Sequence, residues 1–177
     1  LAPEAPKTFE EMVTKGSQLV KDGKATNAVL LTVSKTGDAY HSYPFLKAFG
    51  GGVFAQKPNG DYDPAQVIVG SAGSIQGGDQ LAALGKAGIL STNVDGGIVD
   101  QVFDAGKAPY AMTGPWAIDK AKKAGVKYAI SPLPTIGGKQ MTPFLGVQMF
   151  YVSAKAKNDA FAQEFVTKYV TQKDLQI

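Results

Sequence analysis

The sequence contains no cysteine and no arginine, and it has a single histidine among its 177 residues. Without cysteine, disulfides, thiolate chemistry and cysteine-ligated zinc sites are excluded. All 18 basic residues are lysines, and they are scattered apart from one short cluster at 120–123. Nucleic-acid and phosphate sites favour the planar guanidinium group of arginine, so the net charge of +3 does not indicate a nucleic-acid partner.

Long apolar runs and paired carboxylates are also scarce. No run approaches the roughly 20 residues that span a bilayer, and residues 1–6 lack the features of a secretory signal, so the sequence neither indicates nor excludes export. Three of the four glutamates lie in or before the first expected helix, which leaves no obvious glycosidase pair. Any His-based triad or two-His metal site would depend on His41 alone. We therefore expect no enzyme, no metal site and no cofactor.

Strand-like and helix-like segments alternate along the chain. A capping box at Thr8 and Glu11 predicts a helix that ends near Gly23. Further helices are predicted over 40–49, 71–86, 97–105 and 116–124, and from Asn158 onward. Strands are predicted at 27–33, 53–55, 66–69, 109–113, 127–130 and 145–152. This order predicts an α/β fold in which helices cover both faces of a layered sheet.

Two aromatic residues, Tyr40 and Trp116, stand where a loop or strand becomes a helix. Gly114 and Pro115 turn one predicted strand directly into a helix, which aims the Trp116 side chain outward. A sugar ring has an apolar face and a rim of hydroxyl groups, so a flat aromatic ring with polar neighbours suits it. The pattern favours a sugar platform, and a plain core role for both rings is the alternative. His41 is interpreted as a loop or helix-face residue, with a sugar hydrogen bond as another option.

Several motifs resemble those of maltose/maltodextrin-binding proteins, the solute-capturing components of ABC importers. Thr113-Gly114-Pro115-Trp116-Ala117 resembles their tryptophan motif. Asp38-Ala39-Tyr40, followed by Tyr43-Pro44, resembles their acidic-Pro-Tyr sugar-binding loop. Other similar stretches lie in the same order at 1–11, 104–107, 133–135 and 143–147. The chain therefore resembles a second-lobe fragment with a periplasmic-binding-protein-like fold.

The resemblance implies a sugar-binding lobe at 1–143, a hinge strand at 144–150, and a segment at 151–177 that would belong with the other lobe of a longer protein. The implied ligand-binding residues are Asp38, Tyr40, His41, Tyr43 and Trp116, and the implied hinge residues are Phe144, Gly146, Val147 and Gln148. The sequence departs from the family pattern in two places. Asp38-Ala39 replaces a glutamate-proline pair, which shortens the reach of the carboxylate, and His41 replaces an aromatic residue.

The implied function is noncatalytic binding of maltose or a malto-oligosaccharide for delivery to an ABC permease, in an extracellular or periplasmic location. Membrane tethering of the full-length form stays open. Because the other lobe is missing, we expect weak binding by this half-site. The apolar residues of the last helix, Phe161, Phe165 and Tyr169, would lack their partner, which favours a dimer or a segment swap through 151–177. The alternatives are a family member for another oligosaccharide such as trehalose, a carbohydrate-active enzyme that uses Asp38, and a purely structural lobe.

Overall fold

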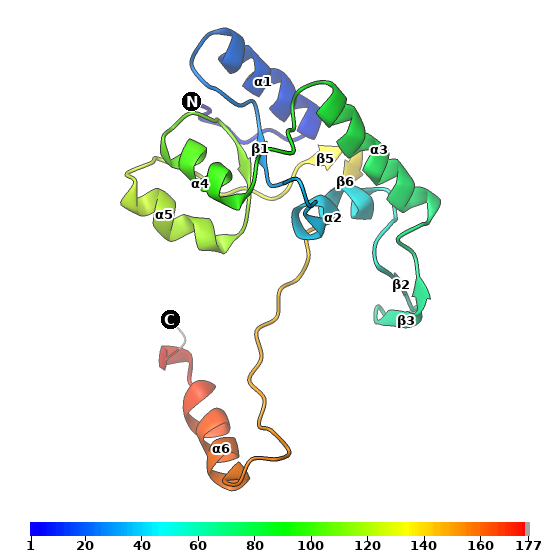
Figure 1. The fold of residues 1–177 in the computed structure, drawn as a ribbon, viewed down its shortest axis with the longest axis vertical. Coiled ribbons are helices and arrows are strands. Elements are labelled where there is room, and N and C mark those ends of the chain that lie inside the picture. Colours follow the sequence, from blue (N-terminus) through cyan, green and yellow to red (C-terminus); the bar gives the residue numbers. More distant parts are fainter. Residues whose placement is uncertain (176–177) are drawn as a thin grey trace. The chain divides into compact units, whose positions relative to one another are not determined.

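The structure, a computed structural model, describes residues 1–175 and divides into two compact units, Leu1–Phe144 and a second that begins at Leu145 (Figure 1). The elements of the first unit are α1 (Phe9–Lys21), β1 (Leu30–Leu31), α2 (Ala39–Ala48), β2 (Phe54–Gln56), β3 (Tyr62–Val67), α3 (Ala72–Lys86), α4 (Gly96–Asp104), β4 (Ala111–Met112), the 3-10 turn η1 (Pro115–Ala117), α5 (Ile118–Lys123), β5 (Thr135–Ile136) and β6 (Lys139–Gln140).

Side-chain caps explain where the longer helices begin. The Thr8 hydroxyl accepts a hydrogen bond from the Glu11 backbone N–H at 3.0 Å, as expected at the start of α1. The Glu11 carboxylate accepts a hydrogen bond from the Lys7 backbone N–H at 3.0 Å. Ser71 and Asp95 cap α3 and α4 in the same way. All five predicted helices of this unit are confirmed, the last with a 3-10 first turn.

A short parallel pair, β1 with β4, lies at the centre of the first unit. Leu31 belongs to an apolar cluster that contains Phe9 of α1 and Phe45 of α2. Leu30, which points to the other face, belongs to a second cluster with Val99 of α4. Both strand residues are buried, so helices cover both faces of this pair.

The predicted strands are only partly found. Three two-stranded sheets form in residues 1–175, β1 with β4, β2 with β3 and β5 with β6, so the mixed helix and strand content is confirmed while the wider layered sheet stays a prediction. The strands predicted at 53–55 and 66–69 are found, with shifted bounds, as the antiparallel pair β2 and β3. The strands predicted at 127–130 and 145–152 are wrong, because in the described chain neither run finds the neighbouring strand that a hydrogen-bond ladder requires.

A hairpin that the sequence did not predict, β5 with β6, forms within residues 135–140. Its two turn residues, Gly137 and Gly138, both have positive φ angles of 54° and 72°. Two consecutive residues of positive φ are the requirement of the tight turn that matches strand twist, and glycine adopts them without steric cost. The Gly137 N–H donates to the Glu10 side chain at 2.8 Å, which ties this hairpin to α1.

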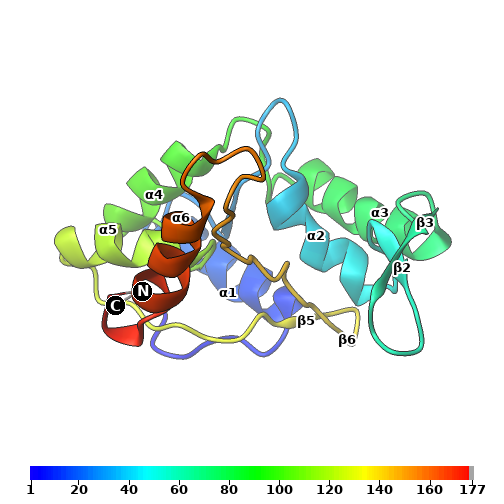
Figure 2. The same cartoon turned by 90° about the horizontal axis from the view of Figure 1, so that it is seen from below.

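Helices α2 and α3 lie side by side, as Figures 1 and 2 show. Their backbones meet at Gly77, where an added Cβ atom would lie 2.6 Å from both the Phe45 carbonyl oxygen and the Leu46 Cα. One turn away, the buried Ser74 hydroxyl accepts from the Gly52 N–H at 3.0 Å and donates to the Ile68 carbonyl at 2.8 Å. Small side chains therefore permit this close helix pairing.

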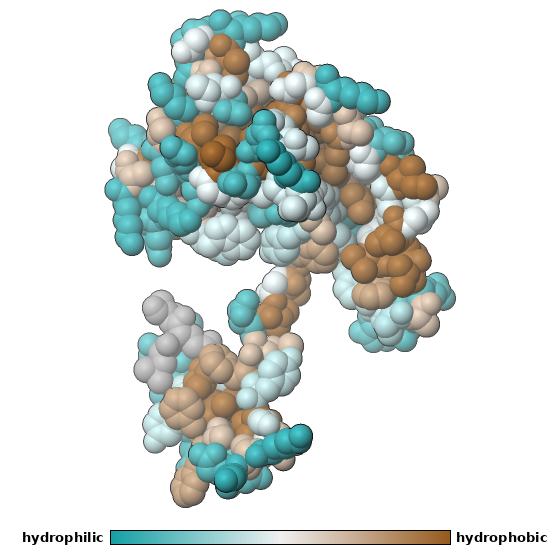
Figure 3. All heavy atoms as spheres, in the orientation of Figure 1, coloured by the Kyte–Doolittle hydropathy of each residue, from teal (hydrophilic) through white to brown (hydrophobic). Residues whose placement is uncertain are grey.

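The second unit has no helix or strand between residues 145 and 158. It then forms α6 (Asp159–Phe165), a π-helical turn (Val166–Val170) and a 3-10 turn (Lys173–Leu175). The predicted helix is confirmed, although the Asn158 side chain does not cap it. Phe161, Phe165 and Tyr169 are all exposed, and apolar atoms are visible on this unit in Figure 3. Among the described helices, none is long and apolar enough to cross a membrane.

Candidate functional site

The candidate site lies at the carboxyl ends of β1 and β4. β1 ends at Leu31 and continues through a loop into α2, and β4 ends at Met112 and turns almost at once into η1. Because the two strands are parallel neighbours, both connections leave the same edge of the sheet. The first turn of α2 and the η1 turn are thereby brought together.

Three of the predicted ligand-binding residues meet there. The ring centroids of Tyr40 and Trp116 lie 5.9 Å apart with an interplanar angle of 55°. The His41 ring is edge-on to both, with centroid distances of 5.4 Å to Tyr40 and 5.9 Å to Trp116. The side chains of Tyr40 and Trp116 are 43% and 51% exposed, whereas His41 is half-buried. The result is an aromatic surface open to solvent with one imidazole ring recessed in it.

The indole ring of Trp116 rests on Gly114. A Cβ atom added at Gly114 would lie 2.2 Å from two carbon atoms of the indole six-membered ring. The flat placement of this ring therefore depends on the missing side chain at position 114. Glycine is therefore needed at position 114 of the tryptophan motif because a larger residue would collide with the Trp116 ring, and not because of its backbone conformation.

We expect Gly114→Ala to push the indole ring out of this position with little loss of stability, because Trp116 is half-exposed and free to move. The emission spectrum of Trp116, the only tryptophan in the chain, should shift, while the urea unfolding midpoint should stay near that of the parent chain. Gly78→Ala is a suitable control, since its Cβ atom meets nothing within 4 Å. An unchanged emission spectrum in the Gly114 variant would contradict the placement of the ring.

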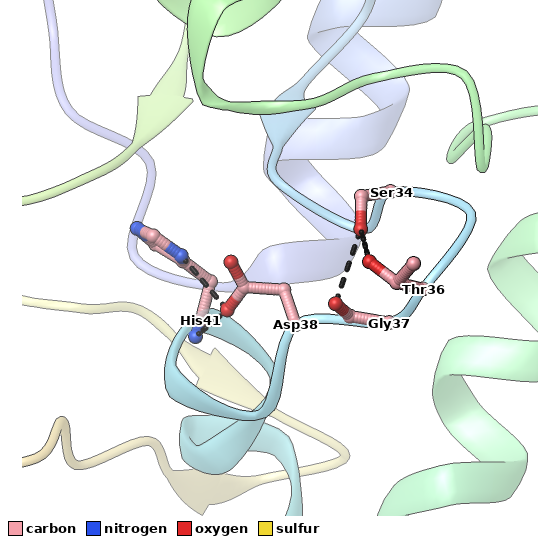
Figure 4. A network of polar contacts seen from close by, with 5 residues as sticks. All are labelled: Ser34, Thr36, Gly37, Asp38 and His41. Carbon is pink, nitrogen blue, oxygen red and sulfur yellow. Dashed lines mark hydrogen bonds and ion pairs between the residues drawn. The ribbon is translucent and has the colours of Figure 1, made fainter.

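Asp38 fixes both the start of α2 and the orientation of His41 (Figure 4). Its Oδ1 atom accepts from the His41 backbone N–H at 2.8 Å and contacts the His41 ring Nδ1 at 3.0 Å. The preceding loop is held by Ser34, which has a positive φ of 54° and whose hydroxyl donates to the Gly37 carbonyl at 3.1 Å. Within the described residues only Oδ1 of Asp38 has a hydrogen-bond partner, so Oδ2 is the oxygen available to a ligand.

Phe144 joins the aromatic surface, a contact that the sequence did not reveal. Its ring stacks on Tyr43 with centroids 3.7 Å apart and 19° between planes, and on Tyr40 at 5.5 Å and 23°. Tyr43 itself is buried, so it supports Phe144 and has little surface to offer a ligand. The only feature of the sequence that could have indicated this contact is that residue 144 is aromatic. The other implied hinge residues, Gly146, Val147 and Gln148, lie in the irregular segment of the second unit.

Burial raises the pKa of Tyr43 from 10.0 to about 12, and the nearby Tyr62 hydroxyl, 3.5 Å from the Tyr43 hydroxyl, adds to this effect. A raised pKa means that the folded chain holds this proton more tightly than the unfolded chain does. The stability linked to Tyr43 is therefore complete below pH 10 and is lost as the pH rises through about 12.

We expect the free energy of unfolding of the parent chain to fall more steeply than that of Tyr43→Phe between pH 10 and 12. The difference should reach at most about 2–3 kcal/mol, the equivalent of a pKa shift of about two units. Urea unfolding at a series of pH values measures it. Parallel pH profiles would show that the Tyr43 hydroxyl is not buried.

A cavity of about 490 Å³ lies behind the η1 turn. Thr113, Gly114, Pro115 and Ala117 line one side, and residues 128–134 line another. No charged side chain lines it, and neither Tyr40, His41 nor Trp116 does. In the described part of the chain no cluster of three or more His, Asp or Glu side chains is placed to hold a metal ion.

Comparison with known proteins places these features in context. Residues 1–177 match the model of a family described as bacterial extracellular solute-binding proteins. A galactooligosaccharide-binding protein of Bacillus subtilis is 28% identical over 97% of the chain and 41% of its own length. A maltooligosaccharide ABC transporter solute-binding lipoprotein of Streptococcus pneumoniae is 27% identical over 94% of the chain and 40% of its own length.

A maltotriose-binding protein of Pyrococcus abyssi is 26% identical over 99% of the chain and 37% of its own length. The chain thus spans about two fifths of the length of these relatives. All three relatives are named for binding an oligosaccharide or for its transport, but the named sugars differ.

Proposed function

Because the chain belongs to the bacterial extracellular solute-binding proteins, we propose that it forms half of an oligosaccharide-binding site that delivers its ligand to an ABC importer. Members of this family bind solutes and are not enzymes, which confirms the prediction that the chain is not a catalyst. The carbohydrate-active enzyme considered from the sequence is thereby set aside. Maltose or a malto-oligosaccharide is the proposed ligand, in line with the pneumococcal and archaeal relatives.

The observation that carries this proposal is the exposed pair of rings, Tyr40 and Trp116, at the carboxyl ends of adjacent parallel strands. Aromatic faces bind the C–H face of a sugar, and exposed polar groups beside them bind its hydroxyls. Asp38 offers one carboxylate oxygen and His41 a ring nitrogen beside these faces. In this proposal Tyr43 acts indirectly, by supporting Phe144.

A galacto-oligosaccharide is the second candidate ligand, because the Bacillus subtilis relative is named for that sugar. Stacking on an aromatic ring recognises the apolar face that glucose and galactose both present, and it does not select between them. Only the polar groups at the rim distinguish hydroxyl positions. A panel of sugars is therefore the direct test.

We expect titration with maltose, maltotriose and a galacto-oligosaccharide to change the fluorescence of Trp116 with a dissociation constant of about 1 mM. A complete site with micromolar affinity corresponds to about −8 kcal/mol, and half of its contacts to about −4 kcal/mol, or about 1 mM. Sucrose at equal concentration controls for viscosity and refractive index. Micromolar affinity would contradict the half-site, and no response to any sugar of the panel would contradict the proposed function.

The proposal extends to the longer protein. Residues 144–150 form its hinge, and the segment from 151 onward packs with its other lobe. The exposed Phe161, Phe165 and Tyr169 side chains support such packing, and in this chain alone they favour a dimer or a segment swap. We propose an extracellular location because the family is described as extracellular. We propose a lipid tether for the longer protein because one relative is named as a lipoprotein.

A further inference from the structure

One buried polar atom of the candidate site has no hydrogen-bond partner among the described residues. Of all buried side-chain nitrogen and oxygen atoms in the described residues, only Nε2 of His41 makes no hydrogen bond. Buried polar groups in native proteins are paired almost without exception, so an unpaired one calls for an explanation. The atom lies on the ring that is in edge contact with Tyr40 and Trp116.

The contact with Asp38 determines what this atom can do. An ionised carboxylate only accepts hydrogen bonds, so the Nδ1 atom 3.0 Å from Asp38 Oδ1 carries the proton. In neutral histidine the proton on one ring nitrogen leaves a lone pair on the other. Figure 4 shows the second nitrogen on the side of the ring away from Asp38. Nε2 of His41 is therefore an acceptor that needs a donor.

Trp116 contacts the ring that carries this acceptor. Its indole ring meets the imidazole ring at 86°, with centroids 5.9 Å apart, and its own side chain is half-exposed. The indole ring lies directly against Gly114, where an added Cβ atom would clash with it.

We propose that Nε2 of His41 is the hydroxyl acceptor that gives the oligosaccharide site its specificity, and that it is uncovered when Trp116 turns onto the bound sugar ring. Asp38 is the positioning residue, because it acts through the tautomer of His41. The ligand class is a sugar with a free hydroxyl at the rim of the stacked ring. This inference rests on the proposed function. It adds a group that distinguishes a sugar with a hydroxyl at this position from the analogue that lacks it.

The single histidine makes a direct test available, since every imidazole signal of the chain belongs to His41. Long-range proton–nitrogen NMR spectra of the full chain should show a protonated Nδ1 and a bare Nε2. Saturating maltotriose, or whichever sugar of the panel binds, should shift the Nε2 signal toward that of a hydrogen-bonded acceptor and leave Nδ1 protonated. A protonated Nε2, or an Nε2 signal that stays unchanged while Trp116 fluorescence responds, would overturn the inference.

Variants at position 41 provide an independent measurement. His41→Phe keeps an aromatic ring and removes the acceptor, whereas His41→Gln places an amide oxygen at about the reach of Nε2. Among monodeoxy analogues of the bound sugar, at least one should bind the parent chain about three- to tenfold more weakly than the sugar itself, the value of one hydrogen bond. His41→Phe should lose this discrimination and His41→Gln should recover part of it.

The two proposals fail in different ways. If Trp116 fluorescence responds to sugar but the parent chain and His41→Phe show the same ratios for every analogue, His41 is not the acceptor and the proposed function stands. If neither the fluorescence nor the Nε2 signal responds to any sugar, the proposed function fails and this inference fails with it. Fluorescence titration suits all three proteins, because each retains Trp116.

Discussion

Trp116→Ala is expected to weaken oligosaccharide binding about thirtyfold, from about 1 mM to tens of millimolar. The substitution removes the larger of the two exposed aromatic faces, and central aromatic residues of a binding site typically contribute about 2 kcal/mol or more. The fold should be unaffected, because half of the Trp116 side chain is in solvent and no buried core cluster includes it. Unfolding of the variant by urea should therefore match that of the parent chain.

The measurement for this variant cannot use tryptophan fluorescence, because Trp116 is the only tryptophan. Chemical-shift changes of the Tyr40 and His41 backbone amides during a sugar titration report on the same surface at millimolar affinity. Trp116→Phe is the matched control, since it keeps a flat ring of smaller area and should lose only a fewfold in affinity. Equal binding by the alanine variant and the parent chain would exclude Trp116 from the sugar contact.

Gly77→Ala is expected to lower the free energy of unfolding by about 2–3 kcal/mol, the usual cost of forcing atoms into a packed interior. The new Cβ atom would lie 2.6 Å from the Phe45 carbonyl oxygen and the Leu46 Cα, both backbone atoms of α2. Backbone atoms inside a helix cannot turn aside as a side chain can. The two helices must move apart, and contacts along the whole pair weaken.

The neighbouring glycine provides the control for this prediction. Gly78 lies in the same helix, faces solvent, and has nothing within 4 Å of a new Cβ atom. Gly78→Ala should raise the free energy of unfolding by up to about 1 kcal/mol, because alanine loses less backbone entropy in a helix than glycine does. Urea unfolding followed by circular dichroism compares the two. Equal stability of the two variants would show that α2 and α3 do not approach at Gly77.

The helices of this chain were predictable because their signals are local. Thr8 caps α1 through the backbone of Glu11, three residues away, and the caps at Ser71 and Asp95 have the same spacing. The strands were less predictable because a strand needs a partner from elsewhere. The apolar run at 127–130 has the composition of a strand, yet Ile130 is 73% exposed and no strand forms there.

In the candidate site, too, local motifs were predictable from the sequence, whereas contacts between distant residues were not. The motifs around Tyr40 and Trp116 indicated two ring positions, and the parallel pairing of β1 with β4 explains why they meet. The stack of Phe144 on Tyr43 joins residues about a hundred positions apart, and no local pattern predicts it. The unpaired Nε2 of His41 is likewise a property of packing, since the sequence does not show which nitrogen is enclosed.

The cavity behind η1 has a mechanical consequence for the aromatic surface. Thr113, Gly114, Pro115 and Ala117, which surround Trp116 in the chain, face about 490 Å³ of open space instead of packed atoms. Close-packed protein interiors resist compression, and a support of this kind does not. We therefore expect the turn that carries Trp116 to yield more easily toward this side than a close-packed turn would.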